Sequence, residues 1–390
     1  MREGGSRCTL KRMALEELVA TDRVPFFDLE PSHRELKDEI ASAISALIED
    51  AGFTNGPAVA QFERAFASFC AAQLCVGTGS GLDALRLGLL AAGIQPGDEV
   101  VVPAMTFVAT LEAVTQAGGR PVLADVSERD YCLSAEAAGA VVKGRTRFLV
   151  PVHLYGQLAD MSALREVAAR SALSIIEDAC QAHGAVRDGI RAGAGGLAAA
   201  FSFYPAKNLG AFGDAGALVT SDTELAARVR ALREHGQYGK YSHELEGYTA
   251  RLDTIQAIVL LHKLPLLTHW NEQRRVAAAF YSAALEGVGD VRTPPVPGGS
   301  DPVWHLYVIR TKRREALRDF LEARGIGSGR HYPEPPHLSR AYAWLGHRSG
   351  AFPVAEALAV EALSLPLFPG ISDAQLEAVV AAVRDFFDRG

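Results

Sequence analysis

One stretch of the chain narrows both its fold and its chemistry: Phe201-Ser202-Phe203-Tyr204-Pro205-Ala206-Lys207-Asn208-Leu209-Gly210. The stretch begins as an apolar strand and ends in a glycine-containing turn, with Lys207 between the two. Lysine side chains are mostly solvated, so a lysine held beside a buried strand is unusual. Burial lowers the pKa of an amine, and the neutral amine is the form that bonds an aldehyde as a Schiff base. A solvated loop lysine is the alternative interpretation.

Apolar runs and helical patterns alternate on both sides of this stretch. The apolar runs predict strands over residues 99–103, 121–126, 147–154, 174–178, 199–204 and 216–221. Helical patterns lie between most of them, over residues 83–93, 108–117, 135–142 and 162–173. The runs are continuously apolar, which is typical of strands covered on both faces. The alternation therefore predicts a mainly parallel sheet in a three-layer α/β/α sandwich.

The pattern changes after residue 221. A helix is predicted to begin near Leu252, and the Pro/Gly-rich segment 293–302 then precedes a predicted strand over 304–310. Two further helices are predicted over 314–324 and 373–387. We expect three parts: an N-terminal extension over 1–23, a large cofactor-binding domain over 24–269, and a smaller C-terminal α+β domain over 270–390.

Composition excludes several classes of protein. The chain has 390 residues, 48% of them hydrophobic and 22% charged, which is typical of a globular protein. Its net charge of −7 (39 basic against 46 acidic side chains) argues against a nucleic-acid-binding protein. No apolar stretch approaches the length of a membrane span. The five cysteines are an odd number without metal-type spacing, so we expect no metal site and a reducing, cytoplasmic environment.

Two other motifs supply groups that complement Lys207. The segment 79–85, GSGLDAL, opens a helix whose N-terminal amides suit a phosphate. Asp178 ends an apolar strand, at the sheet edge where open α/β folds bind ligands. Each motif by itself has a purely structural interpretation: the glycines of 79–85 would form a turn, and Asp178 would cap a helix. Together, a phosphate cradle, a carboxylate and an amine match the phosphate, ring nitrogen and aldehyde of pyridoxal phosphate (PLP). A dinucleotide-binding GxGxxG motif after the first strand is absent.

These motifs resemble those of the DegT/DnrJ/EryC1/StrS family of sugar aminotransferases, which have the aspartate-aminotransferase (type I) fold. The resemblance runs from Val24 to about Phe387. It rests on PFFDL (25–29), GSGLDAL (79–85), VVPAMTFVATLEAV (101–114), PVHLYGQ (151–157), IEDACQAHGA (176–185), FSFYPAKNLGAFGDAG (201–216), RLDTIQA (251–257), HYPEPPH (331–337) and LSLPLFPG (363–370). It implies an active homodimer whose sites are shared between subunits.

The resemblance also implies roles for particular residues. Lys207 would form the Schiff base with PLP and move the proton, and Asp178 would pair with the ring nitrogen. The other implied cofactor contacts are Gln181 to the phenolic oxygen, Phe107 stacked on the ring, and Ser202 with the amides of Gly81 and Leu82 on the phosphate. In the family an asparagine from the partner subunit reaches the phosphate, and here Thr249 stands in its place. Its side chain is shorter, so we expect weaker cofactor affinity and an unchanged reaction.

Finer likenesses concern the substrate. GLDAL and the pattern YPxKNLGAxGD resemble the nucleotide-sugar 3-aminotransferases of deoxyaminosugar pathways, which serve antibiotic biosynthesis. That likeness implies substrate contacts from Tyr204, Lys240, His331 and Tyr332, and amino transfer from L-glutamate to a nucleotide-linked keto-deoxysugar. Three alternatives stay open: a 4-aminotransferase of the same family, a pyridoxamine-phosphate-dependent sugar dehydratase, and a non-enzymatic regulatory protein that retains the pocket. The dehydratases replace the lysine by histidine, so Lys207 argues against them, and the intact Asp178, Gln181 and Lys207 argue against a regulator.

Overall fold

A computed structural model of the protein describes residues 23–389. The expected N-terminal extension, except for Arg23, lies outside the described residues. The helices before residue 264 are α2 (Glu30–Arg34), α3 (Lys37–Asp50), α4 (Pro57–Phe69), α5 (Gly81–Ala91), α6 (Ala109–Gln116), α7 (Ala135–Val141), α8 (Met161–Ser171), α9 (Thr223–Arg233) and α10 (Thr254–Lys263). The strands of the central sheet are β1 (Leu74–Thr78), β2 (Glu99–Pro103), β3 (Arg120–Ala124), β4 (Thr146–Leu149), β5 (Ser174–Asp178), β8 (Ala198–Ser202) and β9 (Gly216–Thr220).

The seven strands lie in the order β1-β9-β8-β5-β4-β2-β3. Among these seven, β9 alone runs antiparallel to its neighbours, and the other pairs are parallel. The predicted mainly parallel α/β/α sandwich is therefore confirmed. The sequence pattern did not predict β1, because its five residues LCVGT hold only three apolar side chains and end in a glycine and a threonine.

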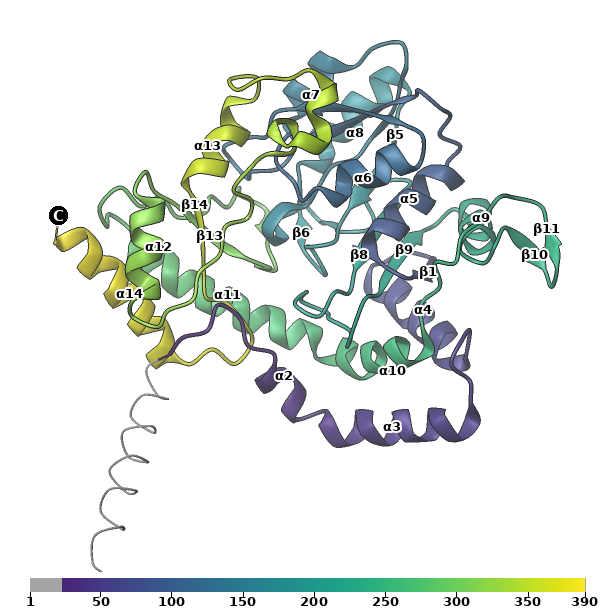
Figure 1. Ribbon diagram of the computed structural model, residues 1–390, viewed down its shortest axis with the longest axis horizontal. Coiled ribbons are helices and arrows are strands. Elements are labelled where there is room, and N and C mark those ends of the chain that lie inside the picture. The colour runs from purple at the N-terminus through teal and green to yellow at the C-terminus, as the bar shows by residue number, and fades with distance from the viewer. Residues whose placement is uncertain (1–22, 390) are drawn as a thin grey trace, which may run out of the picture.

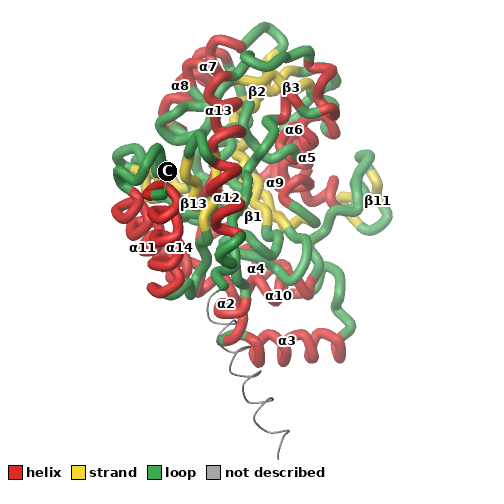
Figure 2. Tube along the Cα trace, turned by 60° about the vertical axis from the view of Figure 1, so that its left-hand side comes forward, coloured by secondary structure: helices red, strands yellow, loops and turns green. Residues whose placement is uncertain are grey.

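Helices cover both faces of the sheet (Figures 1 and 2). On one face α5 packs against β8 and β9 and contacts α6 and α9. A Cβ at Gly88 would lie 2.6 Å from Leu218 Cδ1, so glycine is what allows α5 to lie so close to β9. On the other face the Phe66 ring of α4 meets the rings of Phe201 and Phe203 edge-on, each at 5.0 Å, while α7 and α8 cover the opposite half of the sheet.

The helix predicted from Leu252 consists of α10 and α11 (Leu267–Leu285), joined by the short 3₁₀ turn η2 (Leu264–Leu266). Beyond it lie α12 (Arg314–Glu322), α13 (Pro353–Glu361), α14 (Asp373–Asp388), β13 (Tyr307–Arg310) and β14 (Ala362–Leu365), with the short turns η3 (Pro336–Leu338) and η4 (Arg340–Leu345). Packing of α11, α12 and α14 on the β13–β14 pair creates a second apolar core. Val24 belongs to this core and bridges to Ile326, so the start of the described chain packs on its C-terminal part. The division near residue 270 stays a prediction.

Smaller elements complete the described chain. They are β6 (Val186–Arg187), β7 (Ile190–Arg191) and β12 (Ser300–Asp301), which form one small sheet, η1 (Leu154–Gly156), and the hairpin β10 (Gln237–Gly239) with β11 (Ser242–His243). The hairpin projects from the body of the protein beside α9 (Figures 1 and 2). Within residues 23–389, no helix combines the length and the apolar character that crossing a membrane requires.

Candidate active site

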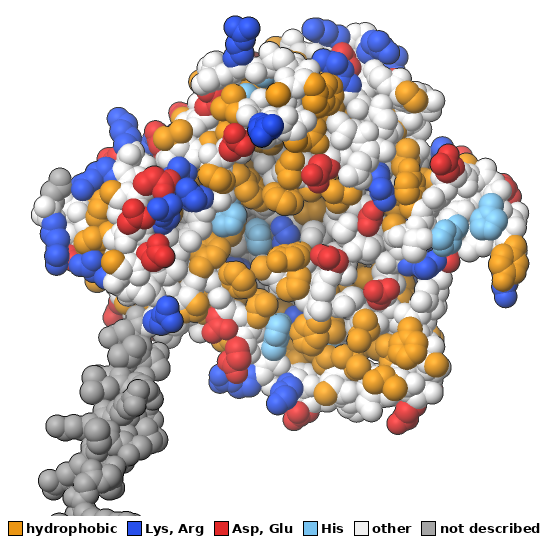
Figure 3. All heavy atoms as spheres, viewed as in Figure 1, with side chains coloured by type: hydrophobic (Ala, Val, Ile, Leu, Met, Phe, Trp, Pro, Cys, Tyr) orange, Lys and Arg blue, Asp and Glu red, His pale blue; other side chains and the backbone are white. Residues whose placement is uncertain are grey.

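A cavity of about 700 Å³ lies at the carboxyl ends of β5 and β8, against the N-terminus of α5. Residues of the central sheet, its helices and the connecting loops supply most of the cavity wall. His305, His331 and Tyr332 close the cavity from the C-terminal part of the chain. Figure 3 shows the hollow in the middle of one face, with histidine and hydrophobic side chains around it. This position follows from the topology, because parallel strands present their carboxyl ends at one edge of the sheet.

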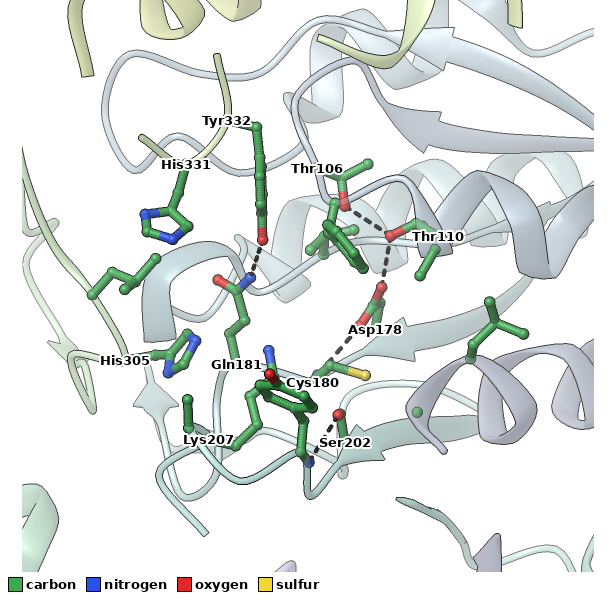
Figure 4. Close-up of a pocket in the computed structure, with 18 of the residues that line it drawn as sticks. Thr106, Thr110, Asp178, Cys180, Gln181, Ser202, Lys207, His305, His331 and Tyr332 are labelled. Carbon is green, nitrogen blue, oxygen red and sulfur yellow. Dashed lines mark hydrogen bonds between the residues drawn. The ribbon is translucent and has the colours of Figure 1, made fainter. Parts of the chain in front are cut away.

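Asp178 is the buried carboxylate of this cavity, at the last residue of β5. Its Oδ2 accepts a 2.7 Å hydrogen bond from the hydroxyl of Thr110, which lies 2.7 Å from the hydroxyl of Thr106. Its Oδ1 accepts from the backbone N–H of Cys180 at 3.2 Å. The carboxylate is thus held in one orientation by a neighbouring helix and by its own turn (Figure 4).

Lys207 follows β8 in a tight turn, where its N–H donates to the carbonyl oxygen of Tyr204 at 2.8 Å. Its amine lines the same cavity as Asp178 and Gln181, and Figure 4 shows the three side chains directed into one space. Burial lowers the pKa of the Lys207 amine, and nearby Cys180 and Asp178 partly oppose that shift. Loss of hydration thus favours the neutral amine that bonding to an aldehyde requires.

The side chain of Gln181 connects the segment that contains Tyr155 to the segment that contains Tyr332. Its Oε1 accepts from the backbone N–H of Tyr155 at 2.7 Å, and its Nε2 donates to the Tyr332 hydroxyl at 3.1 Å. The Tyr332 ring lies 5.5 Å from that of Phe107. The proposed contact of Gln181 with a cofactor oxygen therefore involves an amide that already holds Tyr332.

The N-terminus of α5 forms the third side of the cavity. Ser80 caps the helix by accepting from the Asp83 N–H at 3.0 Å. The next two amides, of Gly81 and Leu82, have no hydrogen-bond partner among residues 23–389. A Cβ at Gly81 would lie 2.7 Å from both Ser202 Cβ and Cys180 Sγ, so only glycine lets the helix approach the strand ends so closely.

The structure brings most of the predicted site residues together. Around the one cavity lie Gly81, Leu82, Phe107, Asp178, Gln181, Ser202, Tyr204, Lys207, His331 and Tyr332. Lys240 and Thr249 do not line it. Lys240 lies at the tip of the β10–β11 hairpin, and the Thr249 hydroxyl lies 3.2 Å from His235 Nε2. The predicted roles of these two residues concern a partner subunit and stay predictions.

Sequence reasoning missed several cavity residues. Thr106 lies in the loop before α6 and Thr110 lies in its first turn, and two threonines at the beginning of a predicted helix were visible in the sequence. His305 and Arg274 offered no such signal, because they reach the cavity only through the packing of the second core. Burial, with a smaller contribution from Lys207, holds the pKa of His305 well below its usual range.

The donor set fits PLP. Unpaired amides at a helix N-terminus suit its phosphate, an oriented carboxylate suits its protonated ring nitrogen, and a desolvated amine suits its aldehyde. The Lys207 amine forms no hydrogen bond or salt bridge with any of residues 23–389, so it is free to serve the cofactor. This fold with this site defines a PLP-dependent aminotransferase of the type I fold.

Comparison with known proteins identifies the family. Residues 34–384 match the DegT/DnrJ/EryC1/StrS aminotransferase family, and the chain belongs to it. A dTDP-3-amino-3,4,6-trideoxy-alpha-D-glucose transaminase of Streptomyces venezuelae is 47% identical over 95% of this chain and 97% of its own length. The erythromycin biosynthesis sensory transduction protein EryC1 of Saccharopolyspora erythraea is 45% identical over 93% and 99%. The crystal structure of S. venezuelae DesV with a ketimine intermediate matches with a TM-score of 0.93 and 47% identity, covering 95% of this chain and all of that one.

Proposed function

We propose that this sugar aminotransferase moves the amino group of L-glutamate to C3 of a nucleotide-linked keto-deoxysugar. The observation that carries the proposal is the cavity itself, where an unpaired Lys207 amine and the oriented Asp178 carboxylate face a wall of aromatic side chains. The names of the similar transaminases supply the sugar class and the position of amination. Aromatic walls suit the apolar faces of a sugar ring.

Bound PLP supplies an aldehyde that bonds amines and a protonated ring that withdraws electrons from the reacting carbon. Asp178, oriented by Thr110, would keep the proton on the ring nitrogen. Lys207, once displaced from the aldehyde, would take the proton from one carbon and return it to another as a general base and acid. Its lowered pKa suits that exchange, because a base works best when its pKa lies near the working pH.

Tyr204 and His331, which both line the cavity, are proposed substrate contacts. Tyr204 is 55% exposed, so its ring is available to a ligand. The His331 Nδ1 lies 2.8 Å from Ser364 Oγ, and burial lowers the pKa of His331 to about 4, so the ring is neutral at pH 7. A neutral ring acts as a hydrogen-bond partner and does not act as a cation toward the sugar nucleotide.

The active unit is proposed to be a homodimer. Lys240 projects on the hairpin β10–β11, away from the cavity of its own chain, and a projecting lysine suits a pyrophosphate as a mobile point charge. Thr249 would offer a hydroxyl to the partner's cofactor phosphate. We also propose a cytoplasmic location, because Cys70, Cys75, Cys132 and Cys180 are unpaired in the described chain.

The test is direct amination by purified protein loaded with PLP. With L-glutamate, a dTDP-linked 3-keto-deoxysugar should give the 3-amino sugar, identified by mass spectrometry and NMR, and the 4-keto isomer should react far more slowly. Preference for the 4-keto isomer would move the protein to the 4-aminotransferases. Loss of water from the sugar without gain of nitrogen would mean a dehydratase, and no reaction with either sugar would favour a regulatory protein.

Lys207→Ala tests the central residue of the proposal. This variant should lose multiple turnovers, because among residues 23–389 no other lysine lines the cavity and could exchange with substrate. Lys312→Ala, at an exposed lysine on the C-terminal part of the chain, is the matched control and should keep wild-type turnover. Reduction of the loaded wild-type protein with borohydride should attach the cofactor to the Lys207 peptide. Attachment to another lysine would contradict the assignment.

A further inference from the structure

Three polar side chains of α10 and α11 hold the loop that follows Lys207. Gln256, Lys263 and Asn271 are spaced seven and eight residues apart, about two helical turns each, so they lie along one face. Gln256 Oε1 accepts from the N–H of Phe212 at 2.8 Å. Asn271 Oδ1 accepts from the side-chain amide of Asn208 at 2.9 Å. The third contact, made by Lys263, is the one that needs explanation.

Lys263 is 3% exposed, and burial lowers the pKa of its amine to about 8. Its Nζ donates to the carbonyl oxygen of Gly210 at 2.7 Å and lies 2.8 Å from His33 Nε2. The ammonium also lies 4.7 Å from the centre of the Phe212 ring. It forms no salt bridge with any carboxylate among residues 23–389, so backbone, imidazole and ring replace its hydration.

A purely structural role explains this arrangement poorly. Burying an ammonium is costly because it loses its hydration, and well-packed apolar residues usually stabilise such a position as well or better. A leucine or methionine would fill the same space between Phe212 and α2. What the ammonium adds is its hydrogen bond to Gly210 and its contact with His33. The function of the charge therefore depends on the segments that these two contacts hold in place.

Gly210 closes the turn that contains Lys207. The N–H of Ala211 donates back to the carbonyl oxygen of Phe203 at 2.8 Å, and the N–H of Lys207 donates to Tyr204. A Cβ at Gly210 would collide with the carbonyl oxygen of Pro205, so the two ends of the turn are in contact. Because the turn is folded on itself, fixing Gly210 also limits the movement of Lys207.

His33 extends the same contact to the N-terminal segment. Its ring packs edge-on against Phe212 at 4.9 Å, and burial, aided by the charge of Lys263, lowers its pKa to about 4, which leaves Nε2 free to accept. Seven residues earlier, Phe26 stacks on His331 at 5.6 Å and lines the cavity. The segment from Phe26 to His33 thus contacts Lys263 and Phe212 at one end and His331 of the cavity wall at the other.

We propose that Lys263 is a positioning residue, which holds the turn 204–210 through the Gly210 carbonyl and so keeps the Lys207 amine buried and aimed into the cavity. The proposal rests on the role of Lys207 proposed above. In this arrangement the two lysines have separate roles: Lys207 reacts, and Lys263 holds the turn in place. Asn271 holds the turn at Asn208, and Gln256 holds Phe212, two residues after the turn.

The test measures Lys207 itself in apoprotein and cofactor binding in the same variants. Lys263→Met keeps most of the side-chain volume and removes the charge. The rate at which an amine-specific reagent labels the Lys207 peptide is followed against pH by mass spectrometry, and PLP binding is followed by fluorescence. We expect the labelling midpoint to rise toward that of an ordinary lysine, and the dissociation constant of PLP to rise about tenfold, as for the loss of one charged hydrogen bond.

Arg310→Met is the matched control, because it removes another buried cation whose partner, Glu361, is remote from the turn. It should leave the labelling midpoint and PLP affinity unchanged. Wild-type values in Lys263→Met, or equal changes in both variants, would overturn the proposal. If Lys263→Met does not fold, His33→Phe takes its place, with a smaller change in the same direction expected and wild-type values overturning the proposal. Failure of the proposed function is distinct: wild-type protein would then not bond PLP at Lys207.

Discussion

The hydroxyl of Thr110 donates a 2.7 Å hydrogen bond to the carboxylate of Asp178, across the interface between α6 and the end of β5. The hydroxyl of Thr106, in the loop before α6, lies 2.7 Å from the Thr110 hydroxyl. Each carboxylate oxygen therefore accepts one hydrogen bond, Oδ2 from Thr110 and Oδ1 from the Cys180 N–H. The carboxylate so oriented lines the cavity, where the proposed ring nitrogen would lie. The electron-withdrawing power of the cofactor would thus depend in part on the threonine that orients Asp178.

Thr110→Val tests this relationship, because valine keeps the shape and removes the hydroxyl. We expect both half-reactions to slow by about tenfold, as for one hydrogen bond to a charged group, with little change in KM. Single-turnover absorbance of the cofactor measures each half-reaction. Thr115→Val is the matched control on the same helix, since the Thr115 hydroxyl contacts the helix carbonyls of Leu111 and Glu112. Equal rates in the two variants would show that Thr110 does not orient the carboxylate.

Asp178→Asn removes the charge itself and keeps the side-chain shape. The ring nitrogen would then lose the anion that keeps it protonated, so both half-reactions should slow by orders of magnitude. PLP should stay bound, because the phosphate contacts at α5 are untouched. Rapid-mixing kinetics and the absorbance of the bound cofactor measure both effects. Rates near those of the wild type would mean that the carboxylate serves only as a cap for the turn at Cys180.

Lys240→Ala tests the proposed action of the hairpin on the partner's substrate. If Lys240 contacts the pyrophosphate, KM for the keto-sugar should rise by up to about a hundredfold, and the half-reaction with glutamate should stay nearly unchanged. Steady-state kinetics and single turnovers separate the two effects. Lys143→Ala, at another exposed lysine, is the control.

Mixed dimers of Lys240→Ala and Lys207→Ala subunits give the sharper result. If the two residues serve sites on different subunits, one site of the mixed dimer carries both defects and the other carries neither. About half of the wild-type activity should then return. If both residues serve the site of their own chain, every site keeps one defect and no full site is restored, which would rule out the cross-subunit role.

The pH dependence of stability should reflect His183, which is fully buried beneath Ser202. Burial, with a smaller effect of Lys207, lowers its pKa from 6.5 to about 3. Between these values the unfolded chain binds a proton and the folded protein does not. The free energy of unfolding therefore falls as pH drops from 6.5 toward 3, by up to about 1.4 kcal/mol per pH unit from this group.

His183→Gln removes that titration and keeps a side chain able to donate to the carbonyl of Ser202. The slope of unfolding free energy against pH should be shallower in this variant between pH 4.5 and 6.5. Chemical denaturation of apoprotein at fixed protein concentration measures it, with His269→Gln, at an exposed histidine of α11, as control. An unchanged slope in His183→Gln would mean that the buried ring does not control acid stability.

The sequence by itself determined the fold class and the two central residues of the proposed site. Asp178 ends one predicted strand and Lys207 follows another, and these two strands, β5 and β8, are parallel neighbours. Because parallel strands end at a common edge, local patterns were sufficient to predict that these residues meet. The phosphate-binding helix N-terminus at GSGLDAL (79–85) was also predicted, because its glycines are a local signal for the start of such a helix.

Only the tertiary structure decided which partners these residues have. Thr110 lies 68 residues from Asp178, Tyr332 lies 151 residues from Gln181, and Lys263 lies 53 residues from Gly210. The strand β9 was predicted, but its antiparallel direction and its pairing with β1, more than a hundred residues earlier, were not. Periodicity records which face of an element is buried, because burial repeats with the helix or strand. A hydrogen bond between distant segments depends on how whole elements pack and leaves no repeat along the chain.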